Sequence, residues 1–189
     1  ICEMLKLCDG DKPVFPSTIL FNENWMLRLV LDWCSQHSDE CETLRHLPGS
    51  RWFSEGLLPS AFLARKRGDA LAETWTHADG LIGHFAVGNI GKGDVMLLPD
   101  AAQFTVVEGK MFSPLSKGTK RVVSFDQAAR SVACIAETLR RGQRSPDSMA
   151  LLSFVVVAPA SQIAANVFTD KLTPDSIKQK VTHRVEGYE

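Results

Sequence analysis

The apolar run Leu-Leu-Ser-Phe-Val-Val-Val at residues 151–157 constrains the fold of this chain more than any other segment. It is rich in β-branched residues and shows no alternation of apolar and polar positions. That pattern is typical of a strand that is covered on both faces. Strands of this kind occur in sheets with helices on both sides, so the run predicts an α/β protein.

The strongest helical pattern lies at residues 20–36. Apolar residues recur there at helical spacing on one stripe, and polar residues occupy the opposite side. The members of this stripe after Glu23 are Met26, Leu27, Val30, Leu31 and Cys34. Further helices are expected at residues 59–74 and 124–140, and a last one after Thr173 and Pro174, which form a cap and a first-turn proline.

Three more strands are expected between the second and third helices, whereas residues 38–60 look irregular and polar. The expected strands, with the turn 99–103 joining the last two as a hairpin, are residues 81–87, 94–98 and 104–110. The order α-α-β-β-β-α-β-α predicts a mixed β-sheet flanked by helices on both faces. We expect a single domain over residues 1–189, with a core at about 17–160 and a C-terminal helical extension at about 161–189.

The formal net charge of −1 lowers the expectation of tight, nonspecific binding to nucleic acid, because such binding depends largely on basic side chains. Local basic groups could still form a groove, although each could also be a solvated helix end or loop. These groups are Arg65-Lys66-Arg67, residues 117–121, and Arg140, Arg141 and Arg144. No apolar run reaches the roughly 18 residues of a membrane span, and no membrane contact is expected.

The five cysteines include no C-x-x-C pair. Cys34 and Cys134 lie among apolar neighbours in helical patterns and are expected to be small core residues. The close ligand spacing of a zinc site is missing. The set fits a reducing compartment, and with no visible signal peptide the predicted location is the cytoplasm.

An unusual feature is the sequence Glu108-Gly109-Lys110, which ends an apolar strand with two opposite charges. Glu108 and Lys110 point to the same face of the strand, because side chains alternate between faces. They could form a plain ion pair, or they could belong to a metal site. If Leu98 pairs with Phe104 across the turn, Asp94 lies opposite Glu108, and two adjacent carboxylates would favour a bound Mg²⁺ or Mn²⁺.

Glu23 heads the apolar stripe of its helix, where a carboxylate is unexpected. Burying a charge is costly unless the charge is paired or bound to a metal. Alternatively, a glutamate in the first turn favours the helix dipole and turns towards solvent. The helix alone leaves both interpretations open.

The combination of Asp94, a hairpin, and Glu108-Gly109-Lys110 resembles the metal-binding motif of the PD-(D/E)XK nuclease superfamily, the restriction-endonuclease-like fold. The order helix, three-stranded meander, helix, strand also resembles the core of that family, closest to uncharacterised bacterial members. Glu23 matches the accessory acid of many members, and Gln127 matches a glutamine of several subgroups. The literal Pro99-Asp100 belongs to a turn, so Asp94 is the expected acid.

The resemblance implies a nuclease that hydrolyses phosphodiester bonds, with DNA as the expected substrate and Mg²⁺ or Mn²⁺ as cofactor. Asp94, Glu108 and the Gly109 carbonyl would bind the metal, which would activate a water molecule. Lys110 would orient that water, and its pKa could fall near a metal. Glu23 would hold a second metal or an outer-shell water. The nucleic-acid contacts would come from Gln127, Arg130 and Lys117.

Two alternatives stay open. The chain could use the same fold with an inactive site, as an interaction or nucleic-acid-binding module, because fold alone does not decide function. It could also be an unrelated α/β domain in which Glu108 and Lys110 form only an ion pair. Many members of the resembled family pair their subunits to cut both strands, which suggests a homodimer.

Overall fold

The central feature of the fold is a four-stranded mixed sheet in the order β1-β2-β5-β6. The computed structural model describes residues 22–88, 93–118 and 122–188. The first three of these strands pair antiparallel, and β5 and β6 pair in parallel. The sheet strands are β1 (Arg51–Leu58), β2 (Thr76–Gly83), β5 (Gln103–Gly109) and β6 (Leu151–Val157). The expected α/β class with a mixed sheet is therefore confirmed.

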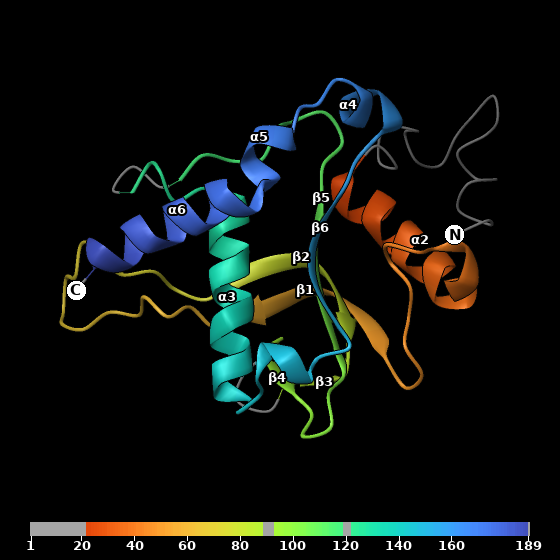
Figure 1. Ribbon diagram of the computed structural model, residues 1–189, viewed down its shortest axis with the longest axis horizontal. Coiled ribbons are helices and arrows are strands. Elements are labelled where there is room, and N and C mark those ends of the chain that lie inside the picture. The colour runs from red at the N-terminus through yellow and green to blue at the C-terminus, as the bar shows by residue number, and fades with distance from the viewer. Residues whose placement is uncertain (1–21, 89–92, 119–121, 189) are drawn as a thin grey trace, which may run out of the picture.

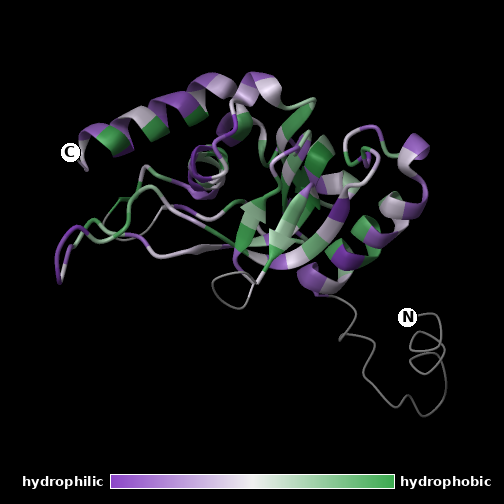
Figure 2. Cartoon of the chain, turned by 90° about the horizontal axis from the view of Figure 1, so that it is seen from below, coloured by the Kyte–Doolittle hydropathy of each residue, from purple (hydrophilic) through white to green (hydrophobic). Residues whose placement is uncertain are grey.

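Helices cover both faces of the sheet, with α2 (Glu23–Gln36) on one side and α3 (Gln127–Arg141) on the other (Figure 1). Because side chains alternate between the two faces of a strand, β5 packs against the helices on both sides of the sheet. Val106 packs in the cluster on the α3 side, whereas its neighbour Val107 packs with Leu27 and Leu31 of α2. Figure 2 shows the hydrophobic strands at the centre of the molecule and polar residues along the outer faces of the helices.

Local signals in the sequence explain where the helices begin. The side chain of Asn22 accepts a hydrogen bond from the Asn24 backbone N–H at the start of α2, and Asp126 accepts one from Ala129 at the start of α3. Thr173 caps α6 (Pro174–Glu186), as its sequence predicted. The predicted strand 151–157 matches β6 residue for residue. Residues 20 and 21 of the first predicted helix lie outside the described residues.

Two segments differ from the sequence expectation. Residues 59–74, expected to be helical, are irregular, and residues 51–58, expected to be irregular, form the edge strand β1. The segment 59–74 is held by tertiary contacts, because Arg65 bonds to the backbone of Tyr188 and Arg184 to that of Leu71. Contacts with a distant helix therefore replace the local helical hydrogen bonds.

The predicted hairpin between residues 94–98 and 104–110 is also wrong. β4 (Val95–Leu97) pairs with β3 (Phe85–Val87) in a separate two-stranded sheet, and β5 pairs with β2 instead. The predicted strand 81–87 is divided between β2 and β3 at Gly83, whose φ of 153° lies in a region that favours glycine. A Cβ atom at this position would lie 2.2 Å from the Gln103 carbonyl oxygen.

Short helices complete the described chain. They are η2 (Ser38–Glu40), η3 (Pro146–Ser148), α4 (Ala160–Ala164) and α5 (Thr169–Leu172). Helix α6 packs across α3 (Figure 1). No helix in the described ranges combines the length and the apolar character needed to cross a membrane.

The cysteines are partly as expected. Cys34 and Cys134 are both buried in the core. Cys34 also forms a disulfide with Cys41, which ties the end of α2 to the segment that follows and was not anticipated. Disulfides are typical of oxidising compartments, so the cytoplasmic location stays a prediction.

We predict that Leu31→Ala lowers the free energy of unfolding by about 2–5 kcal/mol, the usual cost of truncating a fully buried leucine. Leu31 is fully buried between α2 and the sheet. Urea denaturation followed by circular dichroism measures the change. Val185→Ala, at a position of α6 that is 39% exposed, is the control, and an equal loss in both variants would contradict this packing.

Candidate functional site

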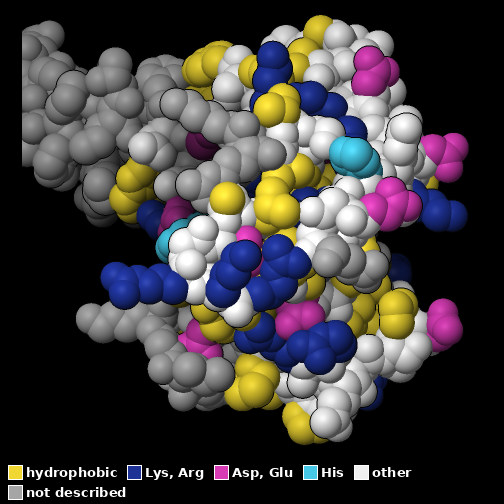
Figure 3. All heavy atoms as spheres, turned by 90° about the vertical axis from the view of Figure 1, so that its left-hand side faces the viewer, with side chains coloured by type: hydrophobic (Ala, Val, Ile, Leu, Met, Phe, Trp, Pro, Cys, Tyr) yellow, Lys and Arg dark blue, Asp and Glu magenta, His cyan; other side chains and the backbone are white. Residues whose placement is uncertain are grey.

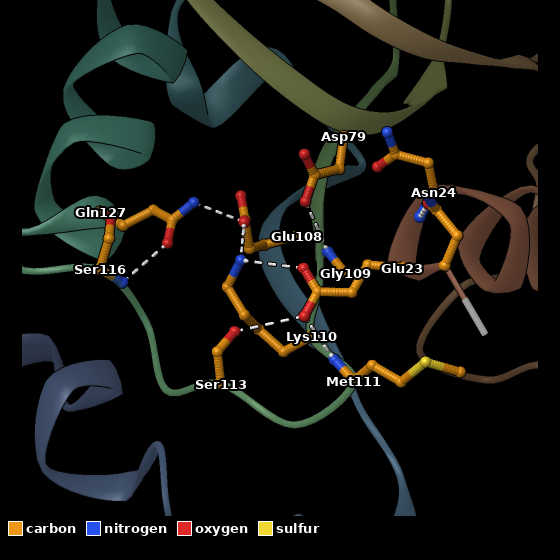
Figure 4. Close-up of polar contacts among 11 residues, drawn as sticks. Glu23, Asn24, Asp79, Glu108, Gly109, Lys110, Met111, Ser113, Ser116 and Gln127 are labelled. Atoms are coloured by element: carbon orange, nitrogen blue, oxygen red, sulfur yellow. Dashed lines mark hydrogen bonds and ion pairs between the residues drawn. The ribbon is translucent and has the colours of Figure 1, made fainter. Parts of the chain in front are cut away.

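Two carboxylates lie side by side where β2 and β5 pair. Gly80 pairs with Val107 in this antiparallel ladder. One step further along the register, Asp79 of β2 lies beside Glu108 of β5. The Asp79 carboxylate accepts a hydrogen bond from the Gly109 backbone N–H at 3.0 Å (Figure 4). Strand pairing therefore places both acids at the same end of the sheet.

The expected partner of Glu108, Asp94, does not lie opposite it. Asp94 precedes β4, is buried, and forms an isolated bridge with Leu57 of β1. The predicted pairing of Asp94 with Glu108 is wrong because the hairpin of β3 and β4 is inserted in the chain between β2 and β5, which pair with each other. Asp79 precedes the strand expected at residues 81–87, but it lies within β2. If residues 104–110 had been paired with the longer strand β2, the register would have placed Asp79 opposite Glu108.

Lys110 is the cation of this cluster. Its Nζ lies 2.6 Å from Glu108 Oε1 and 3.8 Å from Glu23 Oε2, and its side chain is only 10% exposed. Its backbone N–H donates to the Val157 carbonyl at 2.8 Å, which holds the residue at the end of the sheet. The predicted proximity of Glu108 and Lys110 is therefore present in the structure.

Glu23 joins the cluster from the first turn of α2. Its carboxylate accepts hydrogen bonds from the Met111 backbone N–H at 2.8 Å and from the Ser113 hydroxyl at 3.2 Å (Figure 4). Of the two interpretations of this residue, the structure favours a paired carboxylate over one that turns freely into solvent. Its contacts connect α2 to the segment that leaves β5.

Gln127, the first residue of α3, completes the cluster from the other face. Its amide N–H donates to Glu108, and its amide oxygen accepts from the Ser116 backbone N–H at 2.9 Å. The structure thus brings Gln127 to Glu108 but does not do so for Lys117, which is exposed and has no described contact with the cluster. Arg130 lies one turn further along α3 and lines a cavity with Glu108.

Burial and neighbouring charges shift the pKa values of both Glu108 and Lys110. Burial and the charge of the neighbouring Asp79 raise the pKa of Glu108 to about 8, although Lys110 opposes this shift. Burial alone would lower the pKa of Lys110, but its hydrogen bond to Glu108 and the charges of the surrounding acids raise it above the ordinary value. The expected lowering of the Lys110 pKa depends on a bound metal and stays a prediction.

A cavity of about 400 Å³ opens on one side of Glu108. It lies between the start of β2, helix α3 and the segment that precedes β2. Its lining is mostly polar, and it consists of Ala72, Glu73, Thr74, Trp75, Thr76, His77, Glu108, Gln127, Arg130 and Ser131. Sequence analysis did not single out Glu73 or His77, because nothing in the local pattern distinguishes them from ordinary surface residues.

The donor set of the site suits a hard divalent cation. Asp79 and Glu108 provide carboxylate oxygens, and their mutual repulsion in a buried setting is a state that a cation would relieve. Within the described ranges, no group of three or more His, Cys, Asp or Glu residues is gathered closely enough to form a complete metal site. A metal here would need backbone carbonyl and water ligands in addition, as is usual for Mg²⁺.

Comparisons with known proteins add no identification. No family model matches the chain, and neither a curated protein nor a solved structure is significantly similar to it.

We predict that the metal-free protein loses stability as the pH rises from about 5 to 8. With a Glu108 pKa of about 8 in the folded state and an ordinary value near 4.5 when unfolded, the folded protein holds a proton in this range that the unfolded chain has released. The free energy of unfolding therefore falls as the pH rises.

Urea midpoints in EDTA across this pH range measure the effect. Glu108→Gln should flatten the slope, because glutamine resembles the protonated acid and does not titrate. Glu137→Gln, which removes a carboxylate bonded to Arg140 and Arg141, should leave this slope in place. An unchanged slope in Glu108→Gln would contradict the raised pKa.

Proposed function

We propose that the chain is a divalent-metal-dependent nuclease that hydrolyses phosphodiester bonds in DNA. The observation that carries the proposal is the placement of Asp79 and Glu108 on adjacent strands, with Lys110 at 2.6 Å from Glu108. Two acids and a lysine at one end of a sheet can support metal-assisted hydrolysis of a phosphodiester. In this proposal the three residues correspond to the PD-(D/E)XK motif that the sequence resembles, and Asp79 takes the position that the sequence analysis assigned to Asp94.

The topology supports the same proposal. The resemblance implies the order helix, three-stranded meander, helix, strand, and this is the order of α2, β1-β2-β5, α3 and β6. The small hairpin of β3 and β4 is an insertion between the second and third strands of the meander. A restriction-endonuclease-like core is therefore our proposal for the finer fold class.

In the proposed mechanism, Asp79, Glu108 and the Gly109 carbonyl would hold Mg²⁺. Such a metal would supply a water molecule of lowered pKa and would offset charge on the scissile phosphate. Lys110 orients the attacking water or stabilises the extra negative charge as the new P–O bond forms and the old P–O bond breaks. Glu23 holds the ammonium group in place, and Gln127 fixes the orientation of Glu108.

Basic side chains on the surface at the α6 C-terminus would provide further contacts for the phosphate backbone. Figure 3 views the molecule from the side of the α6 C-terminus, where Lys and Arg side chains gather among scattered carboxylates. The exposed residues Arg65, Lys66 and Arg67 belong to the irregular segment before β2. A local basic surface of this kind is compatible with a net charge of −1, because only the groups facing the phosphates contribute to binding.

One observation favours the alternative of an inactive module with the same fold. The Glu108 carboxylate is already bonded to both Lys110 and Gln127, and such a closed network is also what a purely structural ion pair would show. In that case the chain would act through binding rather than cleavage. Metal-dependent activity distinguishes the two functions directly.

We predict metal-dependent cleavage of labelled DNA by the wild-type chain, and a loss of about 100-fold or more in Lys110→Ala and in Asp79→Asn, the scale expected when one charged group that acts in the transition state is removed. Cleavage is measured with Mg²⁺, Mn²⁺ or EDTA, on single- and double-stranded DNA and on RNA of the same sequence. Urea midpoints of each variant show whether it is folded.

Asp100→Asn is the matched control, because Asp100 is an exposed turn aspartate in the literal Pro-Asp sequence. It should retain full activity. The proposal is wrong if the folded wild type cuts no substrate with either metal, or if Lys110→Ala cuts as fast as the wild type. Loss of activity in Asp94→Asn but not in Asp79→Asn would return the metal site to Asp94.

A further inference from the structure

We infer that the cavity beside Glu108 binds one unpaired nucleotide next to the scissile phosphate, so that the enzyme acts at strand ends or unpaired positions. This inference rests on the proposed nuclease function and specifies its substrate. It follows from the size of the cavity, its position beside Glu108, and the side chains that line it.

The shape of the cavity indicates a single nucleotide rather than a continuous duplex. Its volume of about 400 Å³ is within the range of small-ligand sites, which is roughly 300–1,000 Å³. Walls on three sides, formed by β2, α3 and the segment 72–75, confine it. A paired base would have to leave its helix to enter, and this costs least for a base that is already unpaired.

Trp75 provides an aromatic surface in the wall of this cavity. The guanidinium of Arg141 lies 5.4 Å from the centre of the Trp75 ring, and Arg141 is itself held by Glu137 at 2.7 Å. The indole is therefore supported by a fixed neighbour and is only half-buried. Tryptophan rings in this setting stack on nucleobases without requiring a particular base.

Arg130 provides a phosphate-binding group in the same cavity. Its Nε lies 3.9 Å from Glu73 Oε1, which is close enough for electrostatic attraction but too far for a hydrogen bond. Among the described residues, no hydrogen bond occupies the Arg130 guanidinium. Its N–H donors are thus available for a phosphate, and a planar guanidinium binds phosphate oxygens in pairs.

Glu73 explains why Arg130 stays in place before substrate binds. The Glu73 carboxylate accepts a hydrogen bond from Ser60 at 3.3 Å and lies 3.8 Å from the buried Arg184 of α6. Glu73 is therefore fixed from its far side and can hold Arg130 over the cavity without closing it. A base against Trp75 and a phosphate on Arg130 would leave the adjoining phosphodiester near Glu108.

The test uses fluorescently labelled dinucleotides, in deoxy and ribo forms, with binding measured by anisotropy in EDTA so that no cleavage occurs. We expect Trp75→Ala to weaken binding roughly tenfold to hundredfold, the range for removing one stacking aromatic. Trp75→Phe should restore most of it, and Arg130→Ala should weaken it similarly. Trp33→Ala is the control, because Trp33 is 47% exposed on α2 and stacks on His37.

A cleavage assay with Mg²⁺ compares a blunt duplex, a duplex with a single-stranded end, and a single strand. We expect the wild type to prefer the last two substrates, and Trp75→Ala to lose that preference. The deoxy and ribo arms show which sugar the cavity accepts.

The outcomes separate this inference from the proposed function. Dinucleotide binding that depends on Trp75 in a protein that cuts nothing would support the cavity and overturn the nuclease. Cleavage that requires Lys110 but is identical in wild type and Trp75→Ala on all three substrates would overturn the cavity and leave the nuclease intact. Equal dinucleotide binding by Trp75→Ala and wild type would also overturn it.

Discussion

The register between β2 and β5 is the constraint on which the site depends. It places Asp79 beside Glu108, and a shift of one residue would send one of the two acids to the opposite face. Close packing of α2 fixes the same register, because a Cβ atom at Gly80 would lie 2.8 Å from Leu31. The helix that approaches at this glycine is the one that carries Glu23, so a single packing contact positions three acids.

Charge balance explains why the remaining members of the cluster are present. Two adjacent carboxylates in a buried setting repel each other, and the raised pKa of Glu108 reflects first its burial and then that repulsion. Lys110 relieves part of it from within the protein, and Gln127 adds a neutral donor. A divalent cation would relieve more. A metal-bound state would use carboxylate oxygens that the metal-free network already occupies.

The features that depend on neighbouring residues in the sequence were predicted correctly. The strand 151–157, the capped helix after Thr173, and the charged end of β5 with Lys110 all follow from short stretches of sequence. The partner of Glu108 could not be found in this way, because Asp94 and Asp79 both precede apolar stretches and strand pairing alone selects between them. The edge strand β1 and the irregular segment 59–74 were mispredicted for a related reason, since distant contacts override their local preferences.

The C-terminal helix has a role in the cavity that its sequence does not suggest. Arg184 of α6 is fully buried, with its guanidinium 4.3 Å from the centre of the Phe62 ring, and it bonds to the Leu71 backbone. These contacts hold the segment that carries Glu73 and Trp75 against α3. Burying a charged group is costly unless partners compensate, so this arrangement persists only because α6, the segment and α3 are packed together. Helix α6 therefore supports the cavity wall beside Glu108 from behind, although none of its residues lines the cavity.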